Sequence, residues 1–118
     1  MKTTRNALYT LVLMLFIATA ASAQKKQEEV RIKTSAVCKM CKATIERQLA
    51  FTRGVQSSDL DVPSKVVTVT YNPRKTDVAS IRKAINESGY DADELPADPK
   101  AYDKLESCCK KDQAPHEN

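Results

Sequence analysis

Four cysteines, in the pairs Cys38/Cys41 and Cys108/Cys109, are the residues of this sequence with the clearest potential for chemistry. The spacing of the first pair allows both thiolates to bind one metal ion or to form a redox-active disulfide. The only histidine is His116, near the C-terminus, and the sequence contains only two glycines. This composition argues against a histidine-based metal site, a Ser-His-Asp triad and a glycine-rich phosphate loop.

Length and charge narrow the class of protein further. The chain has 118 residues, of which 42% are hydrophobic and 29% are charged. This is enough for one small domain. The formal net charge is only +4. Because a nucleic-acid binder carries a concentrated basic face, this weak excess of positive charge argues against a nucleic-acid partner.

The N-terminus has the three parts of a secretory signal peptide: a basic start, a short hydrophobic run and a cleavage site of small residues. The hydrophobic run, residues 7–20, is shorter than the roughly 20 residues that span a bilayer. We expect residues 1–23 to be removed, which leaves a periplasmic or secreted protein without stable membrane insertion. An uncleaved membrane anchor is the alternative. Cleavage would remove two basic residues, so the mature chain would carry 17 basic and 15 acidic residues.

Alternating hydrophobic and polar residues predict four strands, near residues 30–34, 58–62, 67–71 and 90–94. A helix is expected after the first strand and another after the third. This βαββαβ order predicts an α+β, ferredoxin-like sandwich, in which an antiparallel sheet carries two helices on one face. The domain is expected to cover residues 28–95.

The two helices of this domain have separate start and stop signals. From Cys41 onward a hydrophobic residue recurs every fourth position, which predicts an amphipathic helix, and Gly54 is expected to end it. The second helix is expected to begin at Thr76 or Asp77, either of which can cap it, and to end at Gly89.

The tail, residues 96–118, carries the second cysteine pair. Asp98 and Pro99 are a favourable helix start, and we expect a short helix from Pro99 to about Lys110. Neighbouring residues on a helix point about 100° apart, so two adjacent cysteines seldom bind one ion together. Three roles stay open: a cysteine that joins the first pair in a larger metal site, disulfide formation, or a separate metal-capturing tail.

The position of the first pair predicts reactive thiols. Cys38 is expected in the loop after the first strand and Cys41 in the first turn of the helix. The helix N-terminus, together with Lys39 and Lys42, should lower the pKa of both thiols. Two thiolates without a nearby histidine or carboxylate favour a soft ion: copper(I) first, with mercury(II) as a second candidate. Zinc(II) is a weaker candidate, because its structural sites normally have four ligands.

Residues 30–94 resemble the heavy-metal-associated domain family, which includes soluble copper chaperones, metal-binding domains of copper-transporting P-type ATPases and periplasmic mercury-binding proteins. The resemblance rests on the Cys38-x-x-Cys41 motif between a strand and a helix. It also rests on residues 67–73, in and after the third strand, and on residues 85–90, at the end of the second helix.

The resemblance implies a metal ion held by Cys38 and Cys41, with Tyr90 close to the site. The family usually has a methionine that anchors the loop under the metal, and this chain has Ala36 there. Met40 lies inside the motif, beside the site, and we expect its side chain to be exposed.

We therefore expect an exported, monomeric metal-binding protein and not an enzyme. It would pass its ion by thiolate exchange to a metal-transporting membrane protein or to another thiol-rich metal-binding domain. Two alternatives use the same cysteines: a thiol-disulfide oxidoreductase, and a structural domain held by two disulfides.

Overall fold

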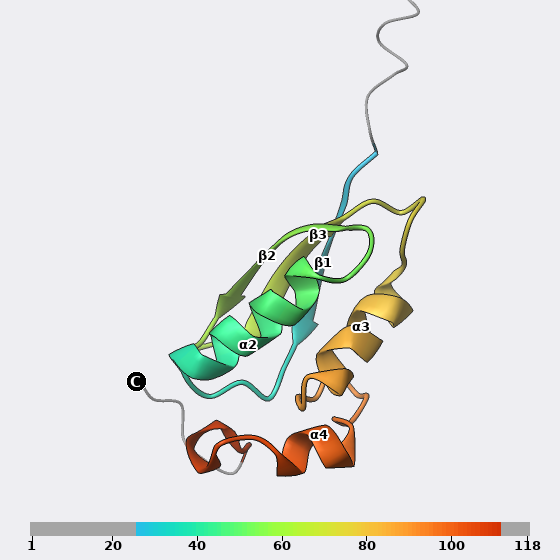
Figure 1. Ribbon diagram of the computed structural model, residues 1–118. Helices are drawn as coiled ribbons and strands as arrows, with labels where there is room; N and C mark the ends of the chain where they lie inside the picture. The colour runs from blue at the N-terminus through green and yellow to red at the C-terminus, as the bar shows by residue number, and fades with distance from the viewer. Residues whose placement is uncertain (1–25, 112–118) are drawn as a thin grey trace, which may run out of the picture.

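The structure is a computed structural model that describes residues 26–111 (Figure 1). The expected signal peptide, residues 1–23, and the end of the tail with His116 lie outside the described residues. None of the helices within residues 26–111 is both long enough and hydrophobic enough to cross a membrane.

A three-stranded antiparallel sheet, with strand order β1-β3-β2, forms one layer of the domain. Its strands are β1 (Glu28–Lys33), β2 (Val55–Asp61) and β3 (Val66–Tyr71). The central strand, β3, buries every second residue from Val67, as a β-branched strand with one face on the core should. The register pairs Val67 with Ile32 on one side and Leu60 on the other, which places all three hydrophobic side chains on that face.

The fourth strand expected at residues 90–94 is reduced to isolated bridges, one of which pairs Ala92 with Thr34. Asp93 has a positive φ of 52°, and this turn stops a regular strand from continuing. Two hydrogen bonds still hold the segment beside β1: the Asp93 amide donates to the Lys33 carbonyl, and the Lys33 amide donates to Asp93 Oδ1. The ferredoxin-like arrangement is therefore kept with a minimal edge strand.

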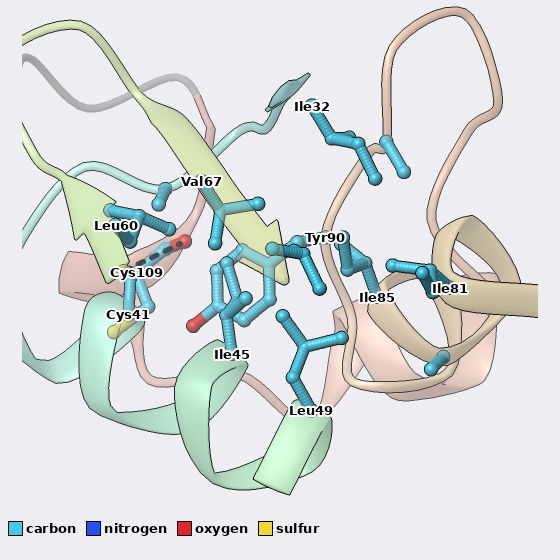
Figure 2. Close-up of a cluster of buried hydrophobic side chains, with 14 of the residues drawn as sticks. Ile32, Cys41, Ile45, Leu49, Leu60, Val67, Ile81, Ile85, Tyr90 and Cys109 are labelled. Carbon is cyan, nitrogen blue, oxygen red and sulfur yellow. Dashed lines mark hydrogen bonds between the residues drawn. The ribbon is translucent and has the colours of Figure 1, made fainter. Parts of the chain in front are cut away.

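Helices α2 (Lys39–Ala50) and α3 (Val78–Glu87) form the second layer (Figure 1). Their buried residues belong to the same core as the sheet residues; they are Cys41, Ile45, Leu49, Ile81, Ala84 and Ile85. The predicted ferredoxin-like α+β fold is thus confirmed. Figure 2 shows how the side chains of α2, α3 and the sheet meet in this core.

The observed ends of the helices agree in part with the ends predicted from the sequence. Asp77 caps α3, because its Oδ1 accepts a hydrogen bond of 2.7 Å from the Ser80 amide. Gly54 does not end α2 directly, since that helix stops at Ala50. It lies instead in the turn before β2, where its φ of +84° suits glycine.

The prediction of a single tail helix from Pro99 to about Lys110 is wrong. The tail forms α4 (Pro99–Asp103), capped by Asp98, and a separate 3-10 turn, η2 (Ser107–Cys109). Glu106 between them is extended, with φ −56° and ψ 147°. An isolated helix of this length is only marginally stable in water. The tail is therefore held in place by its packing against the domain and not by a longer helix.

Candidate metal centre

The loop that carries Cys38 is buried and tied to two other parts of the fold. All residues from Thr34 to Cys38 are buried. The Thr34 hydroxyl donates to the Lys65 carbonyl at 2.8 Å, and the Ser35 hydroxyl accepts from the Asp91 amide at 2.8 Å. These bonds hold the loop between the sheet and the segment after α3. They give it an anchor although Ala36 stands where the family usually has methionine.

The backbone brings the two motif sulfurs together. Cys38 is the extended residue before α2, with φ −153° and ψ 174°, and Cys41 lies in the first turn of that helix. Their Sγ atoms are 3.1 Å apart, and both side chains are fully buried. Both cysteines are unbonded thiols in the structure. This arrangement suits a shared metal ion, and it also suits disulfide formation after oxidation.

The tail brings the second cysteine pair to the same place. Cys109 Sγ lies 3.6 Å from Cys38 Sγ, and Cys108 Sγ lies 3.9 Å from Cys109 Sγ. The Sγ atoms of Cys38, Cys108 and Cys109 all lie within 4.8 Å of one another. Cys41 Sγ also lies 3.9 Å from the Cys109 carbonyl oxygen. All four cysteines therefore form one cluster, although the sequence left this arrangement open.

Tyr90 lies next to this cluster. Its side chain is only 1% exposed, and its hydroxyl makes no hydrogen bond of normal geometry among the described residues, although it lies close enough to the Cys41 thiol to influence it. Figure 2 shows the hydroxyl directed toward the part of the core that holds Cys41 and Cys109. Burial raises the pKa of Tyr90 strongly, and the neighbouring Cys41 raises it further. Tyr90 therefore keeps its proton and presents a neutral donor to the sulfurs.

The three buried thiols differ in how readily they ionise. Burial is the largest influence on Cys41 and opposes its ionisation. Contacts with the Tyr90 hydroxyl, the Val37 backbone and the neighbouring thiols outweigh it and leave the pKa of Cys41 lowered. Burial dominates at Cys38 and at Cys109, and the pKa of each of these thiols is raised. The expected lowering of both motif pKa values is thus right in direction for Cys41, where the Tyr90 hydroxyl, the Val37 backbone and the neighbouring thiols cause it, and wrong for Cys38.

Lys39 and Lys42, the lysines beside the motif cysteines, contribute less positive charge to the site than the sequence predicts. Lys42 Nζ contacts the Glu46 carboxylate and lies 2.8 Å from Asp59 Oδ1, so two carboxylates already compensate its charge. Lys39 is exposed. Met40 is also on the surface, with 46% of its side chain exposed, as the sequence predicted.

The sequence pattern of the heavy-metal-associated domain matches residues 32–91, just over half of the chain. The chain belongs to the heavy-metal-associated domain family. The match runs from the end of β1 to the segment that anchors the loop, and it ends before the tail that carries Cys108 and Cys109.

Two curated members of the family are similar to this chain. A copper chaperone CopZ of Staphylococcus epidermidis is 35% identical over 54 residues, which cover 46% of this chain and 79% of that protein. A periplasmic component of mercuric transport from Shewanella putrefaciens is 29% identical over 83 residues. These cover 69% of this chain and 91% of that protein.

A solved structure supports the same assignment. The water-soluble region of the P-type ATPase CopA from Bacillus subtilis superimposes with a TM-score of 0.55 and 30% identity. The superposition covers 58% of this chain and 46% of that one. The fold of this chain thus also occurs in the water-soluble region of a P-type ATPase.

Proposed function

We propose that this protein binds one soft metal ion through Cys38 and Cys41 and passes it on by thiolate exchange. The observation that supports this most directly is the pair of buried sulfurs, 3.1 Å apart, at the start of a helix. The lowered pKa of Cys41 favours the thiolate that a metal ion requires. The protein acts as a binding module and not as an enzyme.

Copper(I) is the preferred ion in this proposal, and mercury(II) is the second candidate. Thiolates select soft ions, and none of residues 26–111, the part that the structure describes, is a histidine. The copper chaperone and the mercuric transport component among the relatives fit these two ions. Zinc(II) is the third candidate, because its structural sites normally have four ligands and the ion in this proposal is held by Cys38 and Cys41.

The proposed recipient is a metal-transporting membrane protein or another thiol-rich domain. An incoming thiolate forms a bond to the ion while one bond to a resident cysteine breaks, so the ion never leaves sulfur. The presence of this fold in the soluble region of a P-type ATPase supports such a recipient. The signal peptide expected at residues 1–23 and the periplasmic mercuric relative support an exported protein.

The test is a titration of the reduced protein with Cu(I) in competition with the chromophoric chelator bicinchoninate, without oxygen. We expect tight binding of one ion by the wild type and a large loss of affinity in Cys38→Ser and Cys41→Ser. Ser57→Ala, an exposed change in β2, is the matched control and should bind as the wild type does. Equal affinity in all four proteins would overturn the proposal.

A thiol-disulfide oxidoreductase is the second candidate, because two thiols 3.1 Å apart can also form a disulfide. Reduction of insulin disulfides by the metal-free protein separates the two functions. Catalytic turnover without metal would favour the oxidoreductase, whereas a stoichiometric reaction that ends with a stable Cys38–Cys41 disulfide would not.

A further inference from the structure

The tail is docked by residues that surround the metal centre. The main-chain amide of Asp98 donates to the Asn86 carbonyl at 3.0 Å. The Ala97 amide donates to Asp91 Oδ1 at 2.8 Å, and Lys111 Nζ lies 3.5 Å from Asp91 Oδ2. Polar contacts therefore hold the tail on both sides of α4, and they join it to the segment that also anchors the motif loop.

Hydrophobic packing adds to this docking. Leu105 packs against the core, and Cys109 is only 2% exposed. A Cβ atom at Gly89 would lie 3.0 Å from the Ala101 carbonyl and 3.0 Å from Leu105 Cδ2. The tail therefore lies so close to the domain at Gly89 that a larger residue there would clash with it. Leu105 before Cys109 and the Lys111–Asp91 ion pair after it hold this part of the tail in place.

The sulfurs form a continuous row. The distances between neighbouring Sγ atoms are 3.9 Å from Cys108 to Cys109, 3.6 Å from Cys109 to Cys38 and 3.1 Å from Cys38 to Cys41. Their exposure falls along the row: Cys108 is partly exposed, whereas the other three are buried. In the docked state an external ligand can reach the row only at the Cys108 end.

Cys109 Sγ lies within the distance of Cys38 Sγ at which two sulfurs can bind the same ion. A metal–thiolate bond is about 2.3 Å long, so a linear two-sulfur site needs sulfurs about 4.6 Å apart, and a trigonal site needs about 4.0 Å. The observed separations of 3.1 Å and 3.6 Å around Cys38 are shorter than both values, so the sulfurs must move apart slightly around an ion, and Cys109 lies close enough to Cys38 to bind the same ion. The buried Tyr90 hydroxyl, which lacks a partner, supports a negatively charged ligand set at this position.

We propose that Cys109 is a third sulfur ligand of the ion and that Cys108 is the exchange sulfur through which the ion moves between the buried site and the surface. This inference rests on the proposed function, because it concerns the same ion. Each transfer step forms one metal–sulfur bond and breaks another, and the ion keeps its oxidation state. The incoming thiol gives its proton to water, and the released thiolate takes up a proton from water. The tail thereby converts an open two-cysteine site into a closed one with a single outlet.

The experiment uses Cu(I) as the probe, with X-ray absorption to count sulfurs and stopped-flow mixing with excess bicinchoninate to measure release. We expect three sulfurs in the wild type and two in Cys109→Ser. The affinity of Cys109→Ser for Cu(I) should fall at least about tenfold. This is the loss typical of a change outside the ligand shell, and the loss of a ligand should cost no less. Cys108→Ser should keep its three sulfurs and its affinity but release the ion severalfold more slowly. Ser107→Ala, an exposed change directly before Cys108, is the control.

A second variant keeps the proposal testable if serine at position 109 disturbs folding. Leu105→Asp should undock the tail without changing any cysteine, and release should become fast and independent of Cys108. Two sulfurs in the wild type, or unchanged release in Cys108→Ser, would overturn this inference. A wild type that binds no Cu(I), or a Cys41→Ser variant that binds normally, would overturn the proposed function as well.

Discussion

The sulfur of Cys38 lies 3.6 Å from the sulfur of Cys109, although 71 positions separate these residues in the chain. The first belongs to the heavy-metal-associated domain, and the second lies in the tail beyond the family match. Their contact means that the chemistry of the family motif and the packing of the tail depend on one another. A change that loosens the tail should alter the site without touching the motif.

Leu105→Ala tests this dependence. Leu105 is partly buried against the core, so we expect the free energy of unfolding to fall by about 1–2 kcal/mol, below the cost of a fully buried leucine. Reaction of the thiols with an aromatic disulfide reagent should become faster, because Cys109 is no longer held in place. Denaturation in urea and the reaction rate measure the two effects.

The control for this variant is Lys104→Ala, one residue earlier and exposed. It should change neither the stability nor the thiol reactivity. Unchanged reactivity in Leu105→Ala, together with lower stability, would show that Leu105 supports the core but does not hold the tail closed.

Tyr90→Phe should have different effects on the stability of the metal-free protein and on the affinity for Cu(I). The Tyr90 hydroxyl is buried without a partner, a state that costs about 1–3 kcal/mol. Its removal should therefore leave the metal-free protein as stable as the wild type or more stable by about 1 kcal/mol. In the proposed metal-bound protein this hydroxyl faces sulfur ligands, so the variant should bind Cu(I) less tightly. Loss of stability without metal would show that the hydroxyl does have a partner.

The sequence was sufficient for the elements whose signals are local. The alternation of Val67, Val69 and Tyr71 predicted the central strand, and Asp77 predicted the start of α3. The Cys38-x-x-Cys41 motif predicted the pair of adjacent sulfurs. The strand alternation, the cap and the spacing of the two cysteines are each written within a few neighbouring residues, so the local pattern contains the information.

The sequence was not sufficient where distant residues decide the structure. The turn at Asp93 depends on hydrogen bonds to Lys33, so a local pattern predicted a longer last strand than the structure has. The break near Glu106 depends on how Leu105 and Cys109 pack against the domain, so the tail helix was predicted too long. The partners of Lys42 lie partly on β2, so its compensated charge was missed as well.

The Asp77 cap predicts a specific dependence of stability on pH. The Ser80 amide holds the pKa of Asp77 below its ordinary value, so this carboxylate stabilises the folded protein above the unfolded pKa. The contribution disappears as the pH falls through the lowered folded pKa. Asp77→Ala should therefore lower the melting temperature at pH 7, and the difference from the wild type should shrink at pH 3. Asp77→Asn, which keeps a capping oxygen but does not titrate, should show a smaller deficit at pH 7.

The two glycines of the domain provide a matched pair for the role of the tail. Gly89 and Gly54 both have positive φ, +101° and +84°, so an alanine at either position is strained. At Gly54 the new Cβ would meet Thr76, whereas at Gly89 it would meet Ala101 and Leu105 of the tail. Each substitution should lower the free energy of unfolding by about 1–3 kcal/mol.

Only Gly89→Ala should also open the metal centre, because only its clash pushes the tail away. Compared with Gly54→Ala at equal stability, we expect faster reaction of Cys109 with a thiol reagent and faster Cu(I) release. Mass spectrometry after brief alkylation identifies which cysteine reacts. Equal labelling of Cys109 in the two variants would mean that loss of stability alone exposes this sulfur, and that close packing at Gly89 does not keep the site closed.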